Sequence, residues 1–335
     1  MIKVGRNSIL FSDVYLVSSG TVCGNKEHDG PMGKYIDKYY EDSYAGCESW
    51  EKSEQKMLNE AIKIALSKEG ITEHSIDLFV GGDLNNQLAC TNYTVKNYAF
   101  PYLGVYAACS TLTESLIVAS TFIDSNYGNY ILASASSHNA TSERQFRYPT
   151  EYGGQKPSSI TSTATGSGVA LLSSIPSYIK ITKATIGRVV ESNIVDAQDL
   201  GRAMAPACCE TLRNHLHDFA VTPDEYDLIL TGDLSTYGSS CFKKMAEAYG
   251  IKLGDNYNDS GLMLYDLEKQ HVHAGGSGCG CVSLVSLGYV LKKMYENKFK
   301  KVLIIATGAL MNPVMVAQQE NIPSIAHAIV LERVK

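Results

Sequence analysis

Short apolar runs that end in small or polar residues recur in the same order in the two halves of the chain. Residues 76–86, Ile-Asp-Leu-Phe-Val-Gly-Gly-Asp-Leu-Asn-Asn, match residues 226–235, Tyr-Asp-Leu-Ile-Leu-Thr-Gly-Asp-Leu-Ser. Each segment predicts a buried strand that ends in Gly-Asp-Leu and a polar residue. Further matched strands are 130–135 with 302–308 and 166–172 with 325–331. This order of matches predicts an internal duplication.

Helical patterns lie between these strands. Over residues 49–67, apolar side chains fall on one face of a helix, and Gly70 marks the end of that helix. In the second half, residues 207–220 form the corresponding helical pattern before the Gly-Asp-Leu strand. The alternation of strand and helix predicts an α/β fold built from two pseudo-symmetric halves, residues 1–175 and 176–335.

One turn in each half consists of small residues and leads into a long amphipathic segment. In the first half this turn is Ala108-Cys109-Ser110, within the stretch 102–115, and in the second half it is 275–279, Gly-Gly-Ser-Gly-Cys. The dipole of a helix favours the thiolate of a cysteine at its N-terminal end, which is typical of a nucleophile. A buried, unreactive cysteine at a tight turn has the same local pattern. The stretch alone therefore supports both interpretations of Cys109.

The first half carries a polar insert, residues 138–165, that the second half lacks. A loop of this length is either functional or disordered. Its three aromatic residues and Pro149 indicate that it packs against the rest of the chain. We therefore predict that the insert is functional.

The composition is that of an ordinary globular protein. The chain has 335 residues, a net charge of −6 and no stripe of basic residues, which argues against a nucleic-acid partner. Nine scattered cysteines and the lack of a secretory signal predict reduced thiols in a cytoplasmic compartment, and their spacing does not predict a structural zinc site. No apolar run is long enough to cross a bilayer, so we expect any membrane association to be peripheral or through a partner.

Three longer phrases carry a resemblance to a known family. They are His-Asp-Gly-Pro-Met-Gly (28–33), the compositionally unusual stretch 136–157 and Ala-Gly-Gly-Ser-Gly-Cys (274–279). In these phrases, and over essentially its whole length, the chain resembles the stage V sporulation protein AD family. The order of its elements also resembles that of condensing enzymes of the ketoacyl-acyl-carrier-protein synthase III type.

The resemblance implies a thiolase-like fold, in which two βαβαβ halves form an α-β-α-β-α arrangement of layers. It also implies a protein without a cofactor that binds dipicolinic acid, or its calcium complex, and joins membrane-spanning subunits in a complex that moves dipicolinate into the developing spore. The protein would be cytoplasmic and would associate peripherally with the forespore membrane through these partners. By the same resemblance we expect a homodimer that forms through the strand 130–135.

The resemblance also bears on catalysis. In the synthase III pattern, a histidine and an asparagine donate hydrogen bonds to the charges that develop beside the nucleophilic cysteine. Here the position of the histidine falls on Gly232 or Asp233, and that of the asparagine falls on Gly276. An aspartate is normally an anion near pH 7 and cannot donate to an oxyanion unless its pKa is raised far above the ordinary value. We therefore predict a chain that is not an enzyme, in which Cys109 marks an inherited pocket.

The predicted ligand is a small planar dianion, which requires fixed donors in the plane of its carboxylates. The candidate ligand-binding residues are Asp83, Asn86, Cys109, His138, Asn139, Arg147, Tyr148, Asp233, His273, Gly276 and Ser277, and the insert adds Arg144, Phe146 and Lys156. If calcium enters with the ligand, Asp83 and Asp233 become candidate metal ligands. The alternative is that each aspartate caps the helix that follows it.

Two other functions stay open on the sequence. The first is an acyl-transferring enzyme, in which His138 or His273 replaces the usual partners of Cys109. The second is a structural partner that holds membrane subunits together and binds no small molecule. The 21 tyrosines and the lack of a membrane-spanning segment are compatible with this second function.

Overall fold

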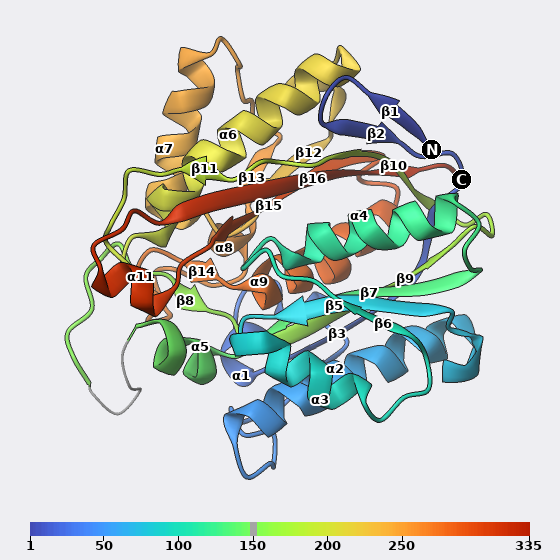
Figure 1. Ribbon diagram of the computed structural model, residues 1–335, viewed down its shortest axis with the longest axis horizontal. Coiled ribbons are helices and arrows are strands. Elements are labelled where there is room, and N and C mark those ends of the chain that lie inside the picture. Colours follow the sequence, from blue (N-terminus) through green and yellow to red (C-terminus); the bar gives the residue numbers. More distant parts are fainter. Residues whose placement is uncertain (148–152) are drawn as a thin grey trace.

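A computed structural model describes residues 1–147 and 153–335. Its main sheet follows the strand order β13-β12-β15-β16-β10-β3-β9-β7-β5-β6 (Figure 1). The strands from the first half are β3 (Tyr15–Cys23), β5 (Leu78–Asp83), β6 (Tyr102–Gly104), β7 (Tyr130–Ser137) and β9 (Gly166–Ser173). Those from the second half are β10 (Ile179–Thr185), β12 (Leu228–Thr231), β13 (Tyr257–Asp259), β15 (Lys301–Ala309) and β16 (Pro323–Arg333).

The two halves repeat one topology. In the first half β5 pairs in parallel with β6 and β7, and β9 pairs antiparallel with β7 and β3. In the second half β12 pairs in parallel with β13 and β15, and β16 pairs antiparallel with β15 and β10. A short antiparallel contact between β10 and β3 joins the two parts of the sheet. The boundary at residue 175 stays a prediction, because β10 belongs to the second half but also touches the first.

Helices separate the two parts of the sheet and cover their outer faces (Figure 1). The main helices are α2 (Trp50–Glu69), α3 (Ala89–Val95), α4 (Thr111–Asp124), α6 (Leu200–Phe219), α7 (Ser235–Ala248), α9 (Cys279–Leu284) and α10 (Leu291–Tyr295). Helix α2 packs on β3 and β9, α4 and α9 lie between the two parts of the sheet, and α6 covers β15 and β16. The expected α-β-α-β-α layers are therefore confirmed. Within the described chain, no helix combines the length and apolar character that crossing a membrane requires.

The hydrophobic core follows these layers. One cluster, which contains Leu58 and Phe79, lies between α2 and the first-half strands. The central cluster contains Leu112 on α4 and Val282 on α9, and a third cluster, with Phe242, lies under α6 and α7. The strands of the sheet are covered on both faces, which is why they read as continuous apolar runs in the sequence.

The predicted dimer contact through residues 130–135 is wrong. These residues lie inside β7, which pairs with β5 on one side and with β9 on the other. Its backbone hydrogen bonds are thus already used within the chain. The strand at this end of the sheet is β6, where Leu103 is 40% exposed.

The insert 138–165 forms a bridge between the halves. It begins with helix α5 (Asn139–Phe146) and ends with the short strand β8 (Ser162–Thr163). Strand β8 pairs in parallel with β14 (Gly276–Ser277) of the second half. Smaller elements are β1 (Ile2–Val4), β2 (Ser8–Leu10), α1 (Asn25–His28), β4 (Lys38–Tyr39), β11 (Val190–Glu191), α8 (Ser260–Met263), the π-helical turn Val285–Val290 and α11 (Pro313–Ala317). The insert therefore places part of the first half directly beside the second small-residue turn.

Candidate functional site

Cys109 lies on a strained turn at the start of α4. Ala108, the residue before it, has a φ of +49°, a left-handed conformation that is unfavourable for a residue with a side chain. Thr111 holds this turn: its Oγ1 donates to the carbonyl of Ala108 at 2.6 Å and accepts from the N–H of Ala107 at 3.2 Å. Such strain concentrates at functional sites. The sharp turn predicted from the small residues is thus present.

A small cavity of about 30 Å³ lies beside Cys109 and is lined by both halves of the chain. Its lining residues are Leu84, Tyr106, Ala108, Cys109, Ser142, Phe146, Arg147, Thr163, Leu200, Ser277, Ala309 and Met311. Most of the wall is apolar, with a small number of polar groups among the apolar ones. This combination is typical of a site that fixes the orientation of a small molecule.

Two residues that line this cavity, one on α5 and one at its end, carry a buried polar group without a partner among the described residues. Arg147 is 3% exposed, and its Nε–H has no acceptor among the described residues. The hydroxyl of Ser142, one and a third helical turns earlier, is also buried and without a partner in the described chain. Buried donors of this kind cost free energy unless something accepts their hydrogen bonds. The two groups are therefore candidate donors to a bound acceptor.

The charge of Arg147 is only partly balanced. Its Nη1 pairs with Oε1 of Glu143, and Nζ of Lys156 lies 3.1 Å from the other oxygen of the same carboxylate. One carboxylate thus faces two cations. This excess of positive charge beside the cavity favours an anionic ligand.

The thiol of Cys109 is buried, at 7% exposure. Burial raises its pKa well above the ordinary value, and the neighbouring carboxyl group of Asp233 acts in the same direction. The N–H of Gly278 and the charge of Arg147 act in the opposite direction but are smaller effects. Since the thiolate is the nucleophilic form, this raised pKa opposes the effect of the favourable position at the start of α4.

Asp233 is itself buried. Burial raises its pKa well above the ordinary value, and so does nearby Asp259, whereas the thiols of Cys281 and Cys109 act in the opposite direction. Its Oδ1 accepts only from the hydroxyl of Ser260, at 3.3 Å, and its Oδ2 has no partner in the part of the chain that the structure describes. The carboxyl group therefore lies behind Cys109 and does not line the cavity.

Gly276, the position expected for a catalytic asparagine, and Gly232, one of the two positions expected for the histidine, are crowded, whereas the other position carries the side chain of Asp233. A Cβ at Gly276 would lie 2.9 Å from Cε2 of Tyr265 and 3.1 Å from Sγ of Cys281. A Cβ at Gly232 would lie 3.0 Å from Cα of Ala306. Such contacts are closer than almost any real Cβ contact, so the neighbouring atoms would have to move.

Some of the predicted site residues come together at the cavity and others do not. Cys109, Phe146, Arg147 and Ser277 line it. The side chain of Arg144 is 47% exposed and pairs with Glu51, away from the cavity. Tyr148 lies outside the described residues.

Both candidate histidines are turned away from Cys109. His138 caps α5: its Nδ1 accepts from the N–H of Ala140 at 3.2 Å, and its Nε2 lies 2.7 Å from the carbonyl oxygen of Ser43. Burial lowers its pKa. His273 is exposed and has a φ of +52°. Neither residue lines the cavity, so the structure offers no imidazole partner for Cys109 in the described chain.

The two candidate asparagines have structural contacts. The side-chain amide of Asn139 donates to the carbonyl of Thr163 at 2.9 Å and so fixes the strand that borders the cavity. Asn86 is exposed and exchanges hydrogen bonds with Gln145, at 3.0 and 3.1 Å. Both residues therefore hold the insert in place and do not reach the cavity.

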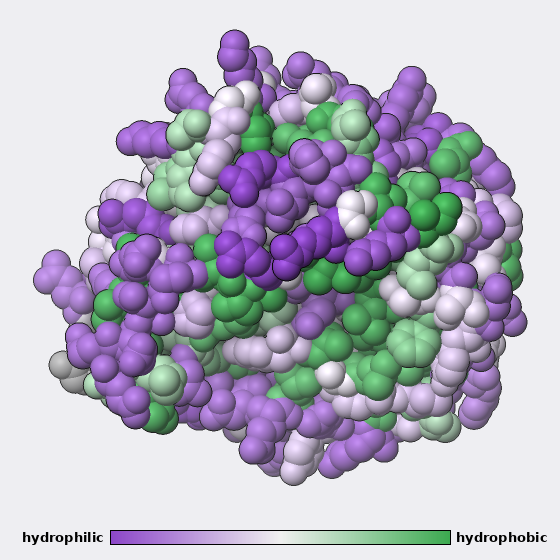
Figure 2. Space-filling view, turned by 45° about the horizontal axis from the view of Figure 1, so that its top comes forward, coloured by the Kyte–Doolittle hydropathy of each residue, from purple (hydrophilic) through white to green (hydrophobic). Residues whose placement is uncertain are grey.

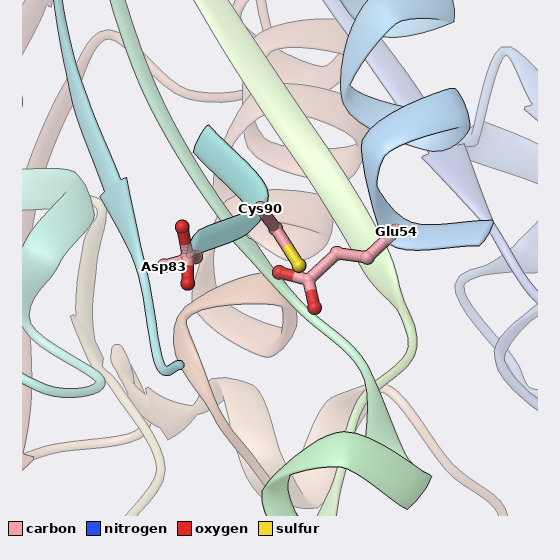
Figure 3. A group of neighbouring side chains, drawn as sticks. All are labelled: Glu54, Asp83 and Cys90. Atoms are coloured by element: carbon pink, nitrogen blue, oxygen red, sulfur yellow. The ribbon is translucent and has the colours of Figure 1, made fainter. Parts of the chain in front are cut away.

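Asp83 belongs to a separate buried network (Figure 3). Glu54 from α2 and Cys90 from α3 place possible metal-ligating atoms within 4.8 Å of one another and of the Asp83 carboxylate. These atoms already have protein donors: Asn85 and Thr91 donate to Asp83, while Ser136 and Asn85 donate to Glu54. Burial, together with Asp83, raises the pKa of Glu54 to about 8. We interpret the group as a hydrogen-bond network that stabilises the fold.

Sequence reasoning missed several residues of the cavity. Ser142 and Thr163 lie in the insert, among many other hydroxyl residues, and no pattern distinguished them. Tyr106 lies in the stretch that leads to Cys109 and could have been found from its position. Leu200 and Met311 come from the second half, and only the packing of the layers brings them to this place.

Comparisons with known proteins agree with this architecture. The family model described as stage V sporulation protein AD matches residues 5–332. The chain is 46% identical over 330 residues to stage V sporulation protein AD from Bacillus subtilis (strain 168), covering 98% of this chain and 97% of that protein.

Solved structures with low sequence identity share the fold. One is 3-oxoacyl-[acyl-carrier-protein] synthase III from Aquifex aeolicus VF5, with 15% identity, a TM-score of 0.58 and coverage of 95% of this chain and 99% of that one. Another is human mitochondrial 3-ketoacyl-CoA thiolase, with 9% identity, a TM-score of 0.61 and coverage of 98% and 100%. These likenesses show that the chain has the thiolase-like fold.

Proposed function

Because the chain belongs to the stage V sporulation protein AD family, whose members are sporulation proteins, we propose that it binds dipicolinate in the cavity beside Cys109. The ligand is free dipicolinate or its calcium complex. In this proposal the protein is the ligand-binding component of a complex that moves dipicolinate into the developing spore. It associates with the forespore membrane peripherally, through the membrane-spanning subunits of that complex.

The observation that carries this proposal is the pair of unpartnered donors in the cavity wall. The Nε–H of Arg147 and the hydroxyl of Ser142 suit the oxygens of a carboxylate. Tyr106 and Phe146 supply aromatic faces in the same wall, which suit a flat pyridine ring. Asp83 and Asp233 do not line the cavity, so calcium that arrives with the ligand would keep the ligand's own carboxylates and water as oxygen ligands.

The cavity is small. Its volume of about 30 Å³ is far below the roughly 300 to 1,000 Å³ of ordinary ligand pockets. Binding therefore requires the walls to separate. The end of α5, which carries Phe146 and leads into Arg147, is the wall whose movement would admit a ligand.

Isothermal titration calorimetry with dipicolinate, with and without calcium, tests the proposal. We expect saturable binding that Arg147→Ala weakens by about 10- to 100-fold, since a hydrogen bond to a charged group contributes about 1.5–3 kcal/mol. Ser142→Ala should weaken it by about 3- to 10-fold, as expected for one neutral hydrogen bond.

Arg144→Ala is the matched control, because Arg144 lies on the same helix but points to Glu51 on the outside. This variant should bind within about twofold of the unchanged protein. If neither free dipicolinate nor its calcium complex gave a heat of binding, the result would contradict the proposal. So would equal losses in the Arg144 and Arg147 variants.

We further propose that the chain does not catalyse condensation. The raised pKa of Cys109, its Asp233 neighbour and the crowded positions 232 and 276 all support this proposal. Mass spectrometry after incubation with an acyl-coenzyme A should find no stable adduct on Cys109. An adduct on this residue would favour the acyl-transferring function instead.

The homodimer also stays a proposal, now through β6. This strand ends the sheet of the first half, and a second copy could continue the sheet there. Light scattering would measure the mass of the particle. A Leu103→Lys variant should shift it towards the monomer, whereas a monomeric unchanged protein would contradict the proposal.

A further inference from the structure

Two connected grooves lie on the outer side of the second half and share no residue with the Cys109 cavity. They form where the β1–β2 hairpin, the residues after β10 and helix α6 meet. One groove has a volume of about 520 Å³ and the other about 300 Å³, and Arg6 and Asn7 line both. The two grooves are therefore parts of one elongated depression.

The larger groove concentrates positive charge. Arg6, Arg188 and Arg213 line it together with a single acidic residue, Glu210, which pairs with Arg188. Arg213 stacks on the ring of Tyr249 at 4.7 Å, and Arg6 has no ion-pair partner among the described residues. Since the whole chain carries a net charge of −6, this local excess of guanidinium groups distinguishes the groove from the rest of the protein.

The smaller groove is mainly apolar and lies beside a free strand edge. Met1, Ile9 and Ile186 line it, and Met1 and Ile186 are 49% and 43% exposed. Strand β1 pairs only with β2, so its other edge offers unpaired backbone groups. Figure 2, in which this part of the molecule is turned forward, shows hydrophobic and strongly hydrophilic side chains next to one another.

The hairpin that carries Arg6 is fixed before any partner binds. The side-chain amide of Asn7 donates to the carbonyl of Ile186 at 3.2 Å, and the carbonyl of Asn7 accepts from the N–H of Ile186 at 2.9 Å. The carboxylate of Asp218 on α6 accepts from the N–H of Asn7 and from the hydroxyl of Ser8, at 3.3 and 2.8 Å. Gly5, with a φ of +55°, lets the backbone approach this carboxylate closely. A preformed groove loses less conformational entropy on binding.

We propose that this depression binds an extended peptide segment of a partner protein in which carboxylates adjoin apolar side chains. The carboxylates pair with the guanidinium groups of Arg6 and Arg213, which suit planar, bidentate contacts, while Arg188 stays paired with Glu210. The apolar side chains of the segment cover Met1, Ile9 and Ile186. The free edge of β1 adds backbone hydrogen bonds, as in other cases of strand addition. A concave, elongated surface fits a peptide better than it fits a flat bilayer.

The test measures binding of a fluorescein-labelled peptide, Asp-Glu-Asp-Glu-Ile-Val-Ile-Gly, to the full chain by fluorescence anisotropy. We expect binding that weakens steeply with salt and that is absent for the same peptide with lysine in place of the acidic residues. The double variant Arg6→Ala/Arg213→Ala should weaken binding at least tenfold. The control double variant Lys63→Ala/Lys298→Ala removes the same charge from exposed positions elsewhere and should leave binding unchanged.

Three results would overturn the proposal. The first is equal binding by the arginine variant and the control variant. The second is lack of binding by the acidic peptide. The third comes from sedimentation with phosphatidylglycerol vesicles: if the arginine variant loses vesicle binding while the peptide does not bind, the surface recognises lipid. Circular dichroism verifies that the variants are folded, and dipicolinate binding is measured in parallel because it depends on the other site.

Discussion

The aspartates that end equivalent strands of the two halves have opposite environments. Asp83, at the end of β5, accepts hydrogen bonds from the N–H of Asn85 at 2.8 Å and from the N–H and hydroxyl of Thr91 at 2.7 and 2.6 Å. Among the described residues, Asp233, after β12, accepts a hydrogen bond only from the hydroxyl of Ser260, at 3.3 Å. Thus Asp83 caps the start of α3, whereas Asp233 is left beside the thiol of Cys109.

The difference comes from a third aspartate. Asp259, at the end of β13, accepts from the N–H groups of Leu234, Ser235 and Gly261 and from the hydroxyl of Thr231. It therefore takes the capping role at the start of α7. This leaves Asp233 free to occupy the region where the related enzymes would place catalytic groups. The aspartates of two identical Gly-Asp-Leu phrases thus have different roles. The difference depends on Asp259, which is distant from Asp233 in the sequence.

The largest expected effect is on stability. Asp83→Ala and Asp259→Ala should each lower the free energy of unfolding by about 3–5 kcal/mol, because several buried donors would lose their acceptor. Asp233→Ala should lower it by only about 1 kcal/mol, since a single weak hydrogen bond is lost. Urea unfolding followed by circular dichroism measures all three variants. A loss for Asp233→Ala as large as that for Asp83→Ala would show that the two environments are equivalent.

The two small-residue turns also differ, and Gly276 tests the second one. Gly276→Asn should lower the free energy of unfolding by about 2–3 kcal/mol, because its side chain would overlap with Tyr265 and Cys281. It should not restore condensing activity. Ala108→Gly, in the first turn, is the contrasting variant: it should leave stability nearly unchanged or raise it, since glycine tolerates the φ of +49°. Equal effects at the two positions would contradict this difference.

The fold was predictable from the sequence because its signals are local and repeated. The buried strands and the Gly70 end of α2 follow from residues within one element. The duplication then supplied the topology, since each half had to repeat the other. The dimer strand was placed wrongly because nothing in residues 130–135 reveals which strand lies at the edge.

The site was predictable only in part. Cys109 and Ser277 followed from the turns, and Arg147 from the chemistry of an anionic ligand. The sequence did not predict that Asp259 caps α7 and Asp233 does not, because this depends on which of the two carboxylates reaches the N–H groups at the start of α7. The orientation of His138 depends in the same way on a distant contact, its hydrogen bond with the carbonyl of Ser43.

A smaller effect concerns pH. The pKa of Glu54 is raised to about 8, so folding favours the protonated form, and its contribution to stability is lost as the pH rises from about 4.5 to about 8. Glu54→Gln should therefore flatten the decline of stability across this range by at most about 1.4 kcal/mol per pH unit. In the second half, the pKa of Asp259 is raised to about 6. Asp259→Asn should therefore flatten the decline of the free energy of unfolding with pH only below pH 6. Urea midpoints at pH 5, 6, 7 and 8 distinguish the two windows, and identical profiles would contradict this assignment.

The smallest expected effect is on the reactivity of Cys109. At pH 7.5, iodoacetamide should alkylate Cys109 at least about tenfold more slowly than Cys47, a less buried cysteine, because the Cys109 thiol is buried and its pKa is raised. Asp233→Ala removes only the second cause of that raised pKa, so it should increase the rate at Cys109 by no more than about threefold. Peptide mapping by mass spectrometry measures both rates in the same sample. If this substitution made Cys109 as reactive as Cys47, Asp233 and not burial would be the main cause of the low reactivity of Cys109. The aspartates of the two halves would then differ in their effect on a neighbouring cysteine as well as in helix capping.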